Sequence, residues 1–150
     1  MRRVRIRQLL GVVAAALLAL SLWPIPYLAA PSWTVSVVTD DGRALVGVNV
    51  RLVYQNYSTE GDSHELTSET DREGHARFTA QYQSASLVQR LYHSLSSAGA
   101  GAHASFGRHA HVFVFGRGYE GTATDGRFVT DWRGTPDAME STIIAKSLRR

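Results

Sequence analysis

Alternation of apolar and polar residues is the feature that most restricts how this chain can fold. Trp33, Val35 and Val37 alternate with polar residues, and residues 46–54 place valine, leucine or tyrosine at every second position. Successive side chains of a strand point to opposite faces of a sheet, so this period of two predicts strands with one buried and one polar face. Turns rich in Asp and Gly follow these segments. About seven short strands separated in this way predict a mainly β fold, a β-sandwich.

The predicted strands are residues 33–38, 46–54, 64–70, 76–80, 108–115, 128–129 and 139–146. A different period interrupts them, because Leu87, Leu91 and Leu95 are spaced by four residues, which is typical of a short amphipathic helix. We interpret residues 81–107 as an insertion that contains this helix and a loop at 96–107. We expect the helix to cover an open edge or end of the sandwich, because sheet edges are usually protected.

The N-terminus has a different character. Residues 8–39 carry no charge, and residues 9–22 are mainly leucine, alanine and valine. A spanning helix needs roughly 20 apolar residues, so residues 9–30 predict a transmembrane helix in a lipid bilayer, with Trp23 and Tyr27 at the far interface. The arginines that precede it should stay in the cytoplasm. The predicted organisation is a basic tail and signal anchor at 1–31 and a periplasmic, extracytoplasmic domain at 32–150, tethered by a single pass to the inner (cell) membrane.

A cleaved signal peptide is the alternative interpretation of the same segment, and it would release the domain as a secreted soluble protein. Cleavage requires small residues three positions and one position before the cut. A cut after Ala30 places Leu28 at the first of these positions, and a cut after Ala29 places Tyr27 there. Neither residue is small, so the sequence favours an anchor that stays uncleaved.

The net charge of +3 belongs to the tail. Removing Arg2, Arg3, Arg5 and Arg7 from the 16 basic residues leaves 12, against 13 acidic residues, a net charge of −1. Nucleic-acid binding needs a basic face on the domain itself, so we predict no nucleic-acid partner. The chain has no cysteine, which excludes thiolate zinc sites, thiol catalysis and disulfides.

Two glycine turns and their flanking strands follow a known pattern. Residues 38–52 read VTDDGRALVGVNVRL, residues 70–78 read TDREGHARF, and Gly118-Tyr119 follows a later strand. These segments resemble the carboxypeptidase regulatory-like domain, a transthyretin-like, Ig-like Greek-key sandwich. The chain departs from that family at Ala44, where the family has proline, and in the length of 81–107. The resemblance implies a non-enzymatic accessory or binding module outside the cytoplasm.

Six histidines raise the question of a metal site. His109 and His111 share one face of the predicted strand 108–115, where both imidazoles could reach one ion, and His103 is near in sequence. No carboxylate close to them completes a ligand set, and histidines on a half-solvated strand are usually plain polar surface. We interpret the acids of the turns, Asp41 and Asp71 among them, as turn caps, because their spacing differs from that of an EF-hand.

These observations predict a non-catalytic interaction or structural module, tethered to the membrane, with no cofactor, no catalytic residue and a protein or cell-envelope partner that the sequence does not identify. The first alternative is a metal- or small-ligand-binding domain that uses the His109/His111 face. A metal-dependent enzyme is the third hypothesis. It requires at least three histidines or acids to converge in a pocket with an open coordination position.

Overall fold

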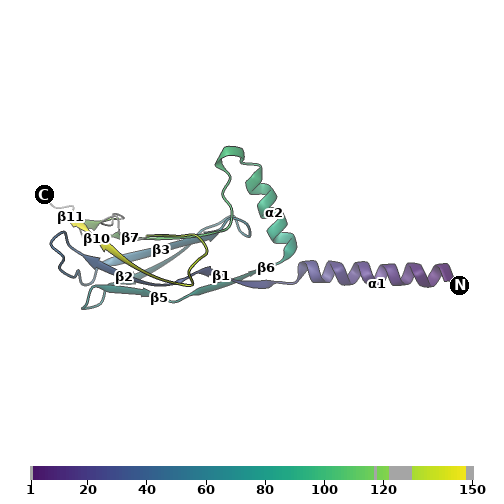
Figure 1. The fold of residues 1–150 in the computed structure, drawn as a ribbon, viewed down its shortest axis with the longest axis horizontal. Helices are drawn as coiled ribbons and strands as arrows, with labels where there is room; N and C mark the ends of the chain where they lie inside the picture. Colours follow the sequence, from purple (N-terminus) through teal and green to yellow (C-terminus); the bar gives the residue numbers. More distant parts are fainter. Residues whose placement is uncertain (1, 117, 122–129, 148–150) are drawn as a thin grey trace.

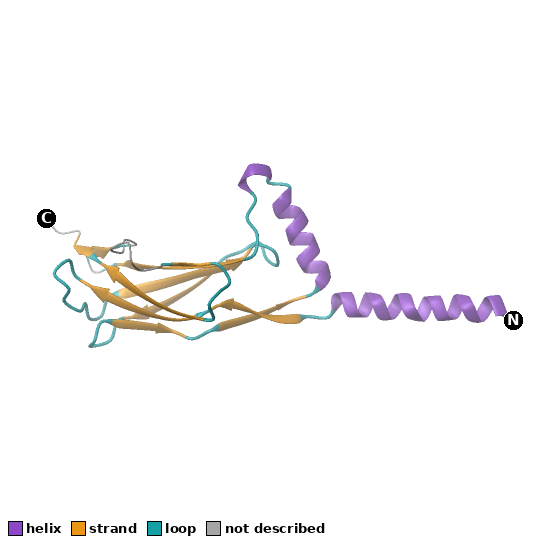
Figure 2. Cartoon of the chain, viewed as in Figure 1, coloured by secondary structure: helices purple, strands orange, loops and turns teal. Residues whose placement is uncertain are grey.

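The computed structural model describes residues 2–116, 118–121 and 130–147 (Figure 1). The chain is mainly β, as predicted, with strands forming one body and helices projecting from it (Figure 2). In chain order the elements are α1 (Arg2–Leu22), β1 (Ile25–Ala30), β2 (Ser32–Val38), β3 (Asn49–Asn56), β4 (His64–Glu69), β5 (His75–Phe78), β6 (Gln81–Ala85), α2 (Leu87–Ala98), the 3-10 helix η1 (Gly101–His103), β7 (Arg108–Phe115), β8 (Tyr119–Glu120), β9 (Asp131–Trp132), β10 (Ala138–Ile144) and β11 (Lys146–Ser147). The strand predicted at 128–129 lies outside the described residues.

One sheet has the order β4-β3-β7-β9. β3 is antiparallel to both of its neighbours, so that Leu52 lies opposite Leu66 of β4 and Val112 of β7. Along β3 and β7 every second side chain is buried and the intervening ones are half-buried or exposed, which confirms the two faces predicted for 108–115. Val46 is an exception, because β3 begins only at Asn49 and the Val46 side chain is exposed.

The second sheet has the order β10-β2-β5. β2 is antiparallel to β5 and parallel to β10, with Ile143 opposite Val37. β1 pairs with β6 in a separate two-stranded sheet. Because β1 directly precedes β2 and β5 directly precedes β6, these four strands form one long ribbon that runs toward the helices (Figure 1).

The two sheets share one hydrophobic core. Its buried members are Leu28, Ala29, Ala30, Trp33, Val35, Val37, Val48, Val50, Leu52, Tyr54, Ala76, Phe78, Ala110, Val112, Val114, Trp132, Ile143 and Ala145. The Trp33 indole N–H, which burial would otherwise leave unpaired, donates to Ser141 Oγ at 2.9 Å. Burial of apolar surface from both sheets is what holds the two layers together.

The turns predicted at 40–43 and 71–74 are confirmed. Gly42 and Gly74 have φ angles of 83° and 80°, in the left-handed region that glycine reaches without steric cost. A side chain at Gly74 would also meet Ala44 and the Val37 carbonyl oxygen at 3.0 Å, whereas one at Gly42 would meet no atom within 4 Å.

The N-terminal segment corrects the prediction of one helix over 9–30. α1 ends at Leu22, and residues 25–30 form strand β1. Pro24 and Pro26 explain the change, since neither has a backbone N–H to continue a helix and both disfavour helical geometry in the preceding residue. Leu28, Ala29 and Ala30 belong to the core. The folded domain therefore begins near residue 25, inside the range 1–31 that we assigned to the anchor.

α1 is 21 residues long and projects from the end of the β ribbon (Figure 1). Its large apolar side chains are exposed on every side of the helix; they include Ile6, Leu9, Leu10, Val12, Val13, Leu17, Leu18, Leu20 and Leu22. No helix in the described part of the chain is both long enough and apolar enough to cross a membrane.

The helix predicted within residues 81–107 is confirmed, whereas its expected packing is not. The first part of this segment is the strand β6, and the helix α2 begins only after Ser86, which caps it. Ser86 Oγ accepts from the Gln89 backbone N–H while the Gln89 side chain accepts from the Ser86 N–H, a reciprocal cap that fixes the start of the helix. We expected α2 to cover the sandwich, but it buries none of its residues.

Candidate functional site

The two histidines of β7 point away from the core. His109 Nε2 lies 3.2 Å from the Phe106 carbonyl oxygen, and its ring meets Tyr57 edge-on, with centroids 5.2 Å apart. The His111 ring stacks on Phe113 at 5.9 Å. A hollow of about 230 Å³ lies beside them, lined by Val53, Tyr54, Gln55, Tyr57, Ser63, His109 and His111. The predicted two-histidine face therefore exists, bordered by tyrosine and aliphatic side chains.

His103, the third candidate metal ligand, ends η1. Among the residues that the structure describes, no three His, Cys, Asp or Glu side chains gather in a way that could hold a metal ion. The structure brings His109 and His111 to one face and does not complete a ligand set with His103.

The turn acids stabilise their turns, in agreement with their interpretation as turn caps. Asp71 accepts from the backbone N–H of His75 at 2.9 Å and pairs with the Arg77 guanidinium at 2.5 Å. The His75 hydrogen bond and the Arg77 charge lower the pKa of Asp71 below its usual range. In the turn at 40–43, a hydrogen bond from the Thr39 hydroxyl, with the nearby Arg43 charge, likewise lowers the pKa of Asp41.

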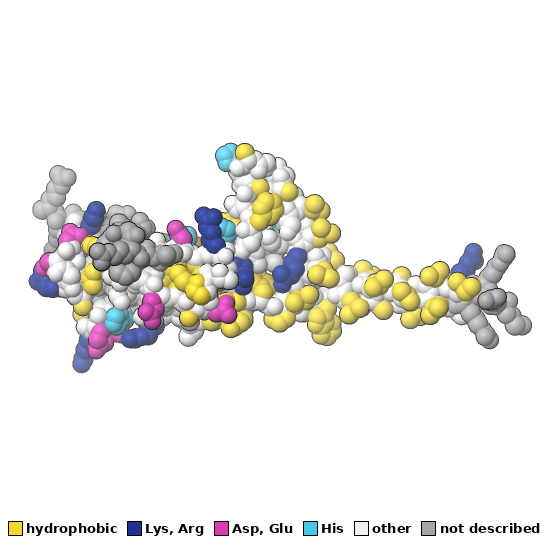
Figure 3. Space-filling model, viewed as in Figure 1, with side chains coloured by type: hydrophobic (Ala, Val, Ile, Leu, Met, Phe, Trp, Pro, Cys, Tyr) yellow, Lys and Arg dark blue, Asp and Glu magenta, His cyan; other side chains and the backbone are white. Residues whose placement is uncertain are grey.

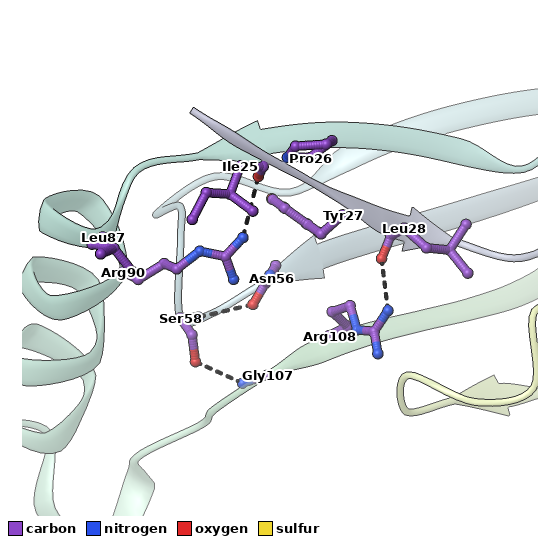
Figure 4. A pocket seen from close by; sticks show the side chains of 10 residues that line it. All are labelled: Ile25, Pro26, Tyr27, Leu28, Asn56, Ser58, Leu87, Arg90, Gly107 and Arg108. Atoms are coloured by element: carbon purple, nitrogen blue, oxygen red, sulfur yellow. Dashed lines mark hydrogen bonds between the residues drawn. The ribbon is translucent and has the colours of Figure 1, made fainter. Parts of the chain in front are cut away.

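A larger hollow opens where the helices meet the sandwich (Figure 4). We call it the basal cleft; its volume is about 610 Å³, and its lining residues are Ile25, Pro26, Tyr27, Leu28, Asn56, Ser58, Leu87, Arg90, Gly107 and Arg108. β1 supplies an apolar wall, and two arginines enter from different elements, Arg90 from α2 and Arg108 from β7 (Figure 4). The cleft thus combines an apolar wall with two cationic groups.

Both arginines are held by backbone carbonyl groups of β1. Arg90 Nη2 donates to the Ile25 oxygen at 3.3 Å, and the guanidinium lies 5.2 Å from the centre of the Tyr27 ring. Arg108 Nη1 donates to the Leu28 oxygen at 3.1 Å. Within the described part of the chain, neither guanidinium forms an ion pair with a carboxylate. A guanidinium has five N–H donors, so each arginine retains donors suited to an anionic group.

A polar cluster fastens β1 to the rest of the domain. The Tyr27 hydroxyl lies 2.8 Å from both Thr59 Oγ1 and Gln83 Oε1, which come from the loop after β3 and from β6. Beside it, His64 Nε2 lies 2.7 Å from Glu60 Oε2, and the His64 ring stacks on Tyr54 at 5.1 Å. These contacts tie the start of the domain to β6 and to the loop after β3.

The faces of α2 are the reverse of those expected for a helix on a globular protein, which turns its apolar stripe toward the core. Its large apolar residues are all exposed: Leu87, Val88, Leu91, Tyr92 and Leu95. The half-buried residues of α2 are polar, namely Arg90, His93, Ser94 and Ser97. Of these, Ser97 donates to the Tyr57 carbonyl oxygen at 3.1 Å. Figure 3 shows hydrophobic side chains along the edge of α2 that is turned toward α1.

The basal cleft was missed by the sequence analysis. Isolated arginines are common on protein surfaces, and nothing in the local sequence links Arg90 to Arg108 or either one to β1. One signal was present, because residues 78–116 carry these two arginines and four histidines but no Asp or Glu. The fixed charges of this stretch are therefore all positive.

Comparison with known proteins identifies no relative. The chain matches no protein-family model, and neither curated proteins nor solved structures match it.

Proposed function

We propose that this chain is a non-catalytic interaction module tethered to a membrane by α1, with its β domain on the extracytoplasmic side of a bacterial-type inner membrane. The observation that carries the proposal is the surface of α1, where leucine and valine side chains are exposed all around the helix. A helix that is apolar on every side needs an apolar surrounding. The arginines that precede the apolar part favour a cytoplasmic N-terminus.

The apolar part of α1 is short for this role. From Leu9 to Leu22 it measures about 21 Å at ~1.5 Å per residue, against a hydrocarbon core of ~30 Å. A short span is accommodated when flanking Arg7 extends its charge to the interface, and when the bilayer thins around the helix. The mismatch also draws the adjoining end of the domain, beginning with Trp23 and Ile25, toward the lipid.

β1 supports an uncleaved tether over a released, secreted domain. Cutting after Ala29 or Ala30 would remove Tyr27 and Leu28 together with most of the strand. The Tyr27 hydrogen bonds to Thr59 and Gln83 would be lost, and the core would lose Leu28 and Ala29, and after the later cut Ala30 as well. Residues that stabilise a folded domain are not expected in a segment that is cleaved from it.

Kinship with the carboxypeptidase regulatory-like domain is part of the proposal. Its support is the pair of glycine turns at Gly42 and Gly74, which lie at the same end of the antiparallel pair of β2 and β5. That family is non-enzymatic. A non-enzymatic role for this chain agrees with the contacts of its turn acids. Asp71 accepts a hydrogen bond from the local backbone, and Asp41 pairs with the neighbouring Arg43 side chain.

Membrane fractionation of the full chain, produced in a bacterial host, tests the tether. We expect the chain to remain in membranes after an alkaline carbonate wash, at the mass of the uncleaved sequence. The double variant Leu17→Arg, Leu18→Arg should be released, because charges in the hydrocarbon are costly. Val46→Arg, which places an arginine on an exposed valine of the domain, should behave like the unaltered chain. Release of the unaltered chain by carbonate would refute the tether.

A further inference from the structure

The position of α2 follows from the pairing of β1 with β6. Ile25 lies opposite Ala85, so the chain leaves α1 and enters α2 at neighbouring points. α2 therefore lies at the end of the domain from which α1 departs (Figure 1). Any membrane that holds α1 is close to α2.

The exposed apolar face of α2 is large for a helix of 12 residues. Leu91 is 62% exposed, Tyr92 67% and Leu95 64%, while polar side chains face the domain. Trp23 (69% exposed) and Ile25 (41%) continue this apolar surface from α1 to the start of β1. Large contiguous apolar surfaces mark sites that bind a membrane or another protein.

We propose that α2 lies on the surface of the anionic phospholipid bilayer that holds α1, with Leu87, Leu91, Tyr92 and Leu95 in the boundary between headgroups and acyl chains. This inference rests on the proposed function, because it requires α1 to be in the membrane. The contact fixes how the sandwich stands on the bilayer and directs the two-histidine face and the turns at Gly42 and Gly74 to defined positions above it.

Charge favours an anionic lipid surface as the occupant. Arg90 and Arg108 line the basal cleft under α2, and residues 78–116 contain no acid. The loop after β3 contacts α2 at Tyr57, and Glu60 of that loop is paired with His64. Phosphate groups of lipid headgroups are suitable acceptors for guanidinium groups, whereas a neutral apolar partner offers them no acceptor.

The tether explains why so few charges suffice. Helices that bind membranes on their own are rich in lysine and arginine, whereas α2 has only Arg90. Held beside the bilayer by α1, α2 meets lipid as an intramolecular event with a high effective concentration. The shortness of α1 acts in the same direction, since it pulls this end of the domain into the interface.

The absence of cysteine makes a site-specific test direct. The variants are Leu91→Cys and Leu95→Cys on the apolar face, Ser96→Cys on an exposed polar position of the same helix, and Glu73→Cys in the turn preceding β5. Each full-length variant is labelled with an environment-sensitive fluorophore and reconstituted in vesicles of phosphatidylcholine and phosphatidylglycerol that carry a lipid-borne quencher. These positions are exposed, so the substitutions leave the core intact.

We expect labels at residues 91 and 95 to emit at shorter wavelength and to be quenched several-fold more than labels at 96 and 73. Labels at 91 and 95 that stay as accessible to water as the label at 73 would overturn the proposal. So would labels shielded from water but not quenched by lipid, which would identify a protein, such as a second copy of this chain, as the occupant. Equal quenching in vesicles of phosphatidylcholine alone would refute the anionic preference.

Flotation of the same vesicles separates the two proposals. If the chain floats with the vesicles but residues 91 and 95 remain in water, the tether stands and the α2 contact fails. If the chain does not float, the tether itself fails.

Discussion

At the scale of single residues, glycine sets the geometry of two turns between the strands. Gly42 and Gly74 share the same left-handed backbone, but only Gly74 is crowded by Ala44 and the Val37 carbonyl oxygen. Substitutions at the two positions therefore separate the free-energy cost of the left-handed backbone from the cost of a steric clash.

We predict that Gly42→Ala lowers the free energy of unfolding by about 1 kcal/mol, the usual cost of placing a side chain in the left-handed region. Gly74→Ala should lower it by about twice as much or more, because the new methyl group also displaces its neighbours. Urea unfolding followed by tryptophan fluorescence measures both. Equal losses would mean that the turn preceding β5 relaxes freely around the added carbon.

Asp71 gives the domain a pH dependence whose sign is fixed. Its pKa is lowered in the folded state by the His75 N–H and by Arg77. The stabilisation is therefore present above the unfolded pKa, near ~4, and is lost as the pH falls through the lower folded value.

We predict that Asp71→Asn destabilises the domain at pH 7, and that its difference from the unaltered chain shrinks below pH ~4. Glu73→Gln is the matched control, since it removes a charge from the same turn and leaves the Asp71 hydrogen bonds in place. Unfolding curves of the unaltered chain and both variants, measured across this pH range, test the prediction. A difference that stays constant down to pH ~2 would show that the carboxylate charge contributes nothing.

At the scale of elements, β1 marks where the domain begins. It contributes Leu28, Ala29 and Ala30 to the core and pairs along its length with β6. A domain cut at the boundary expected from the sequence loses all of this.

We predict that a fragment of residues 24–150 unfolds cooperatively, and that one of residues 32–150 is less stable by about 3 kcal/mol or more, the scale of losing one buried leucine and its surroundings. Both fragments retain Trp33 and Trp132, so fluorescence during urea unfolding compares them directly. If the two fragments were equally stable, β1 would not contribute to the folded domain and would belong to the N-terminal segment.

Much of the sandwich could be predicted from local pattern, because a period of two shows which side chains share a face. The buried sets Val35 with Val37, and Val112 with Val114, are confirmed. β1 could not be found in this way, since residues 25–30 are almost wholly apolar and continue the apolar run before them. The parallel pairing of β10 with β2 also leaves no local mark, because it depends on strands far apart in sequence.

The helix α2 shows a second limit of pattern. The spacing of Leu87, Leu91 and Leu95 predicts one apolar face, and that face exists. The pattern does not tell what this face contacts. We expected it to pack against the sandwich, but in the structure it is exposed on the outside of the domain. The basal cleft was missed for a related reason, because Arg90 and Arg108 come together only through the folding of β1 between them.

At the scale of the whole molecule, two exposed apolar surfaces lie at the same end of the protein. α1 exposes leucine and valine on all sides, and α2 exposes its apolar stripe beside it (Figure 3). The opposite end carries the charged turns around Asp41 and Asp71, with Arg43 and Arg77 as their partners. This polarity along the long axis agrees with the proposal of a module that stands on a membrane.

Cysteine accessibility in intact cells tests this arrangement most directly. Glu73→Cys reports on the turn preceding β5, and Gln8→Cys reports on the N-terminal part of α1, in a chain that otherwise has no cysteine. With the outer membrane permeabilised, a maleimide that cannot cross the inner membrane should label residue 73 at once and residue 8 only after lysis, with both variants in the membrane fraction. Labelling of residue 73 only after lysis, or of both residues in intact cells, would contradict an extracytoplasmic domain held by a cytoplasmic N-terminus.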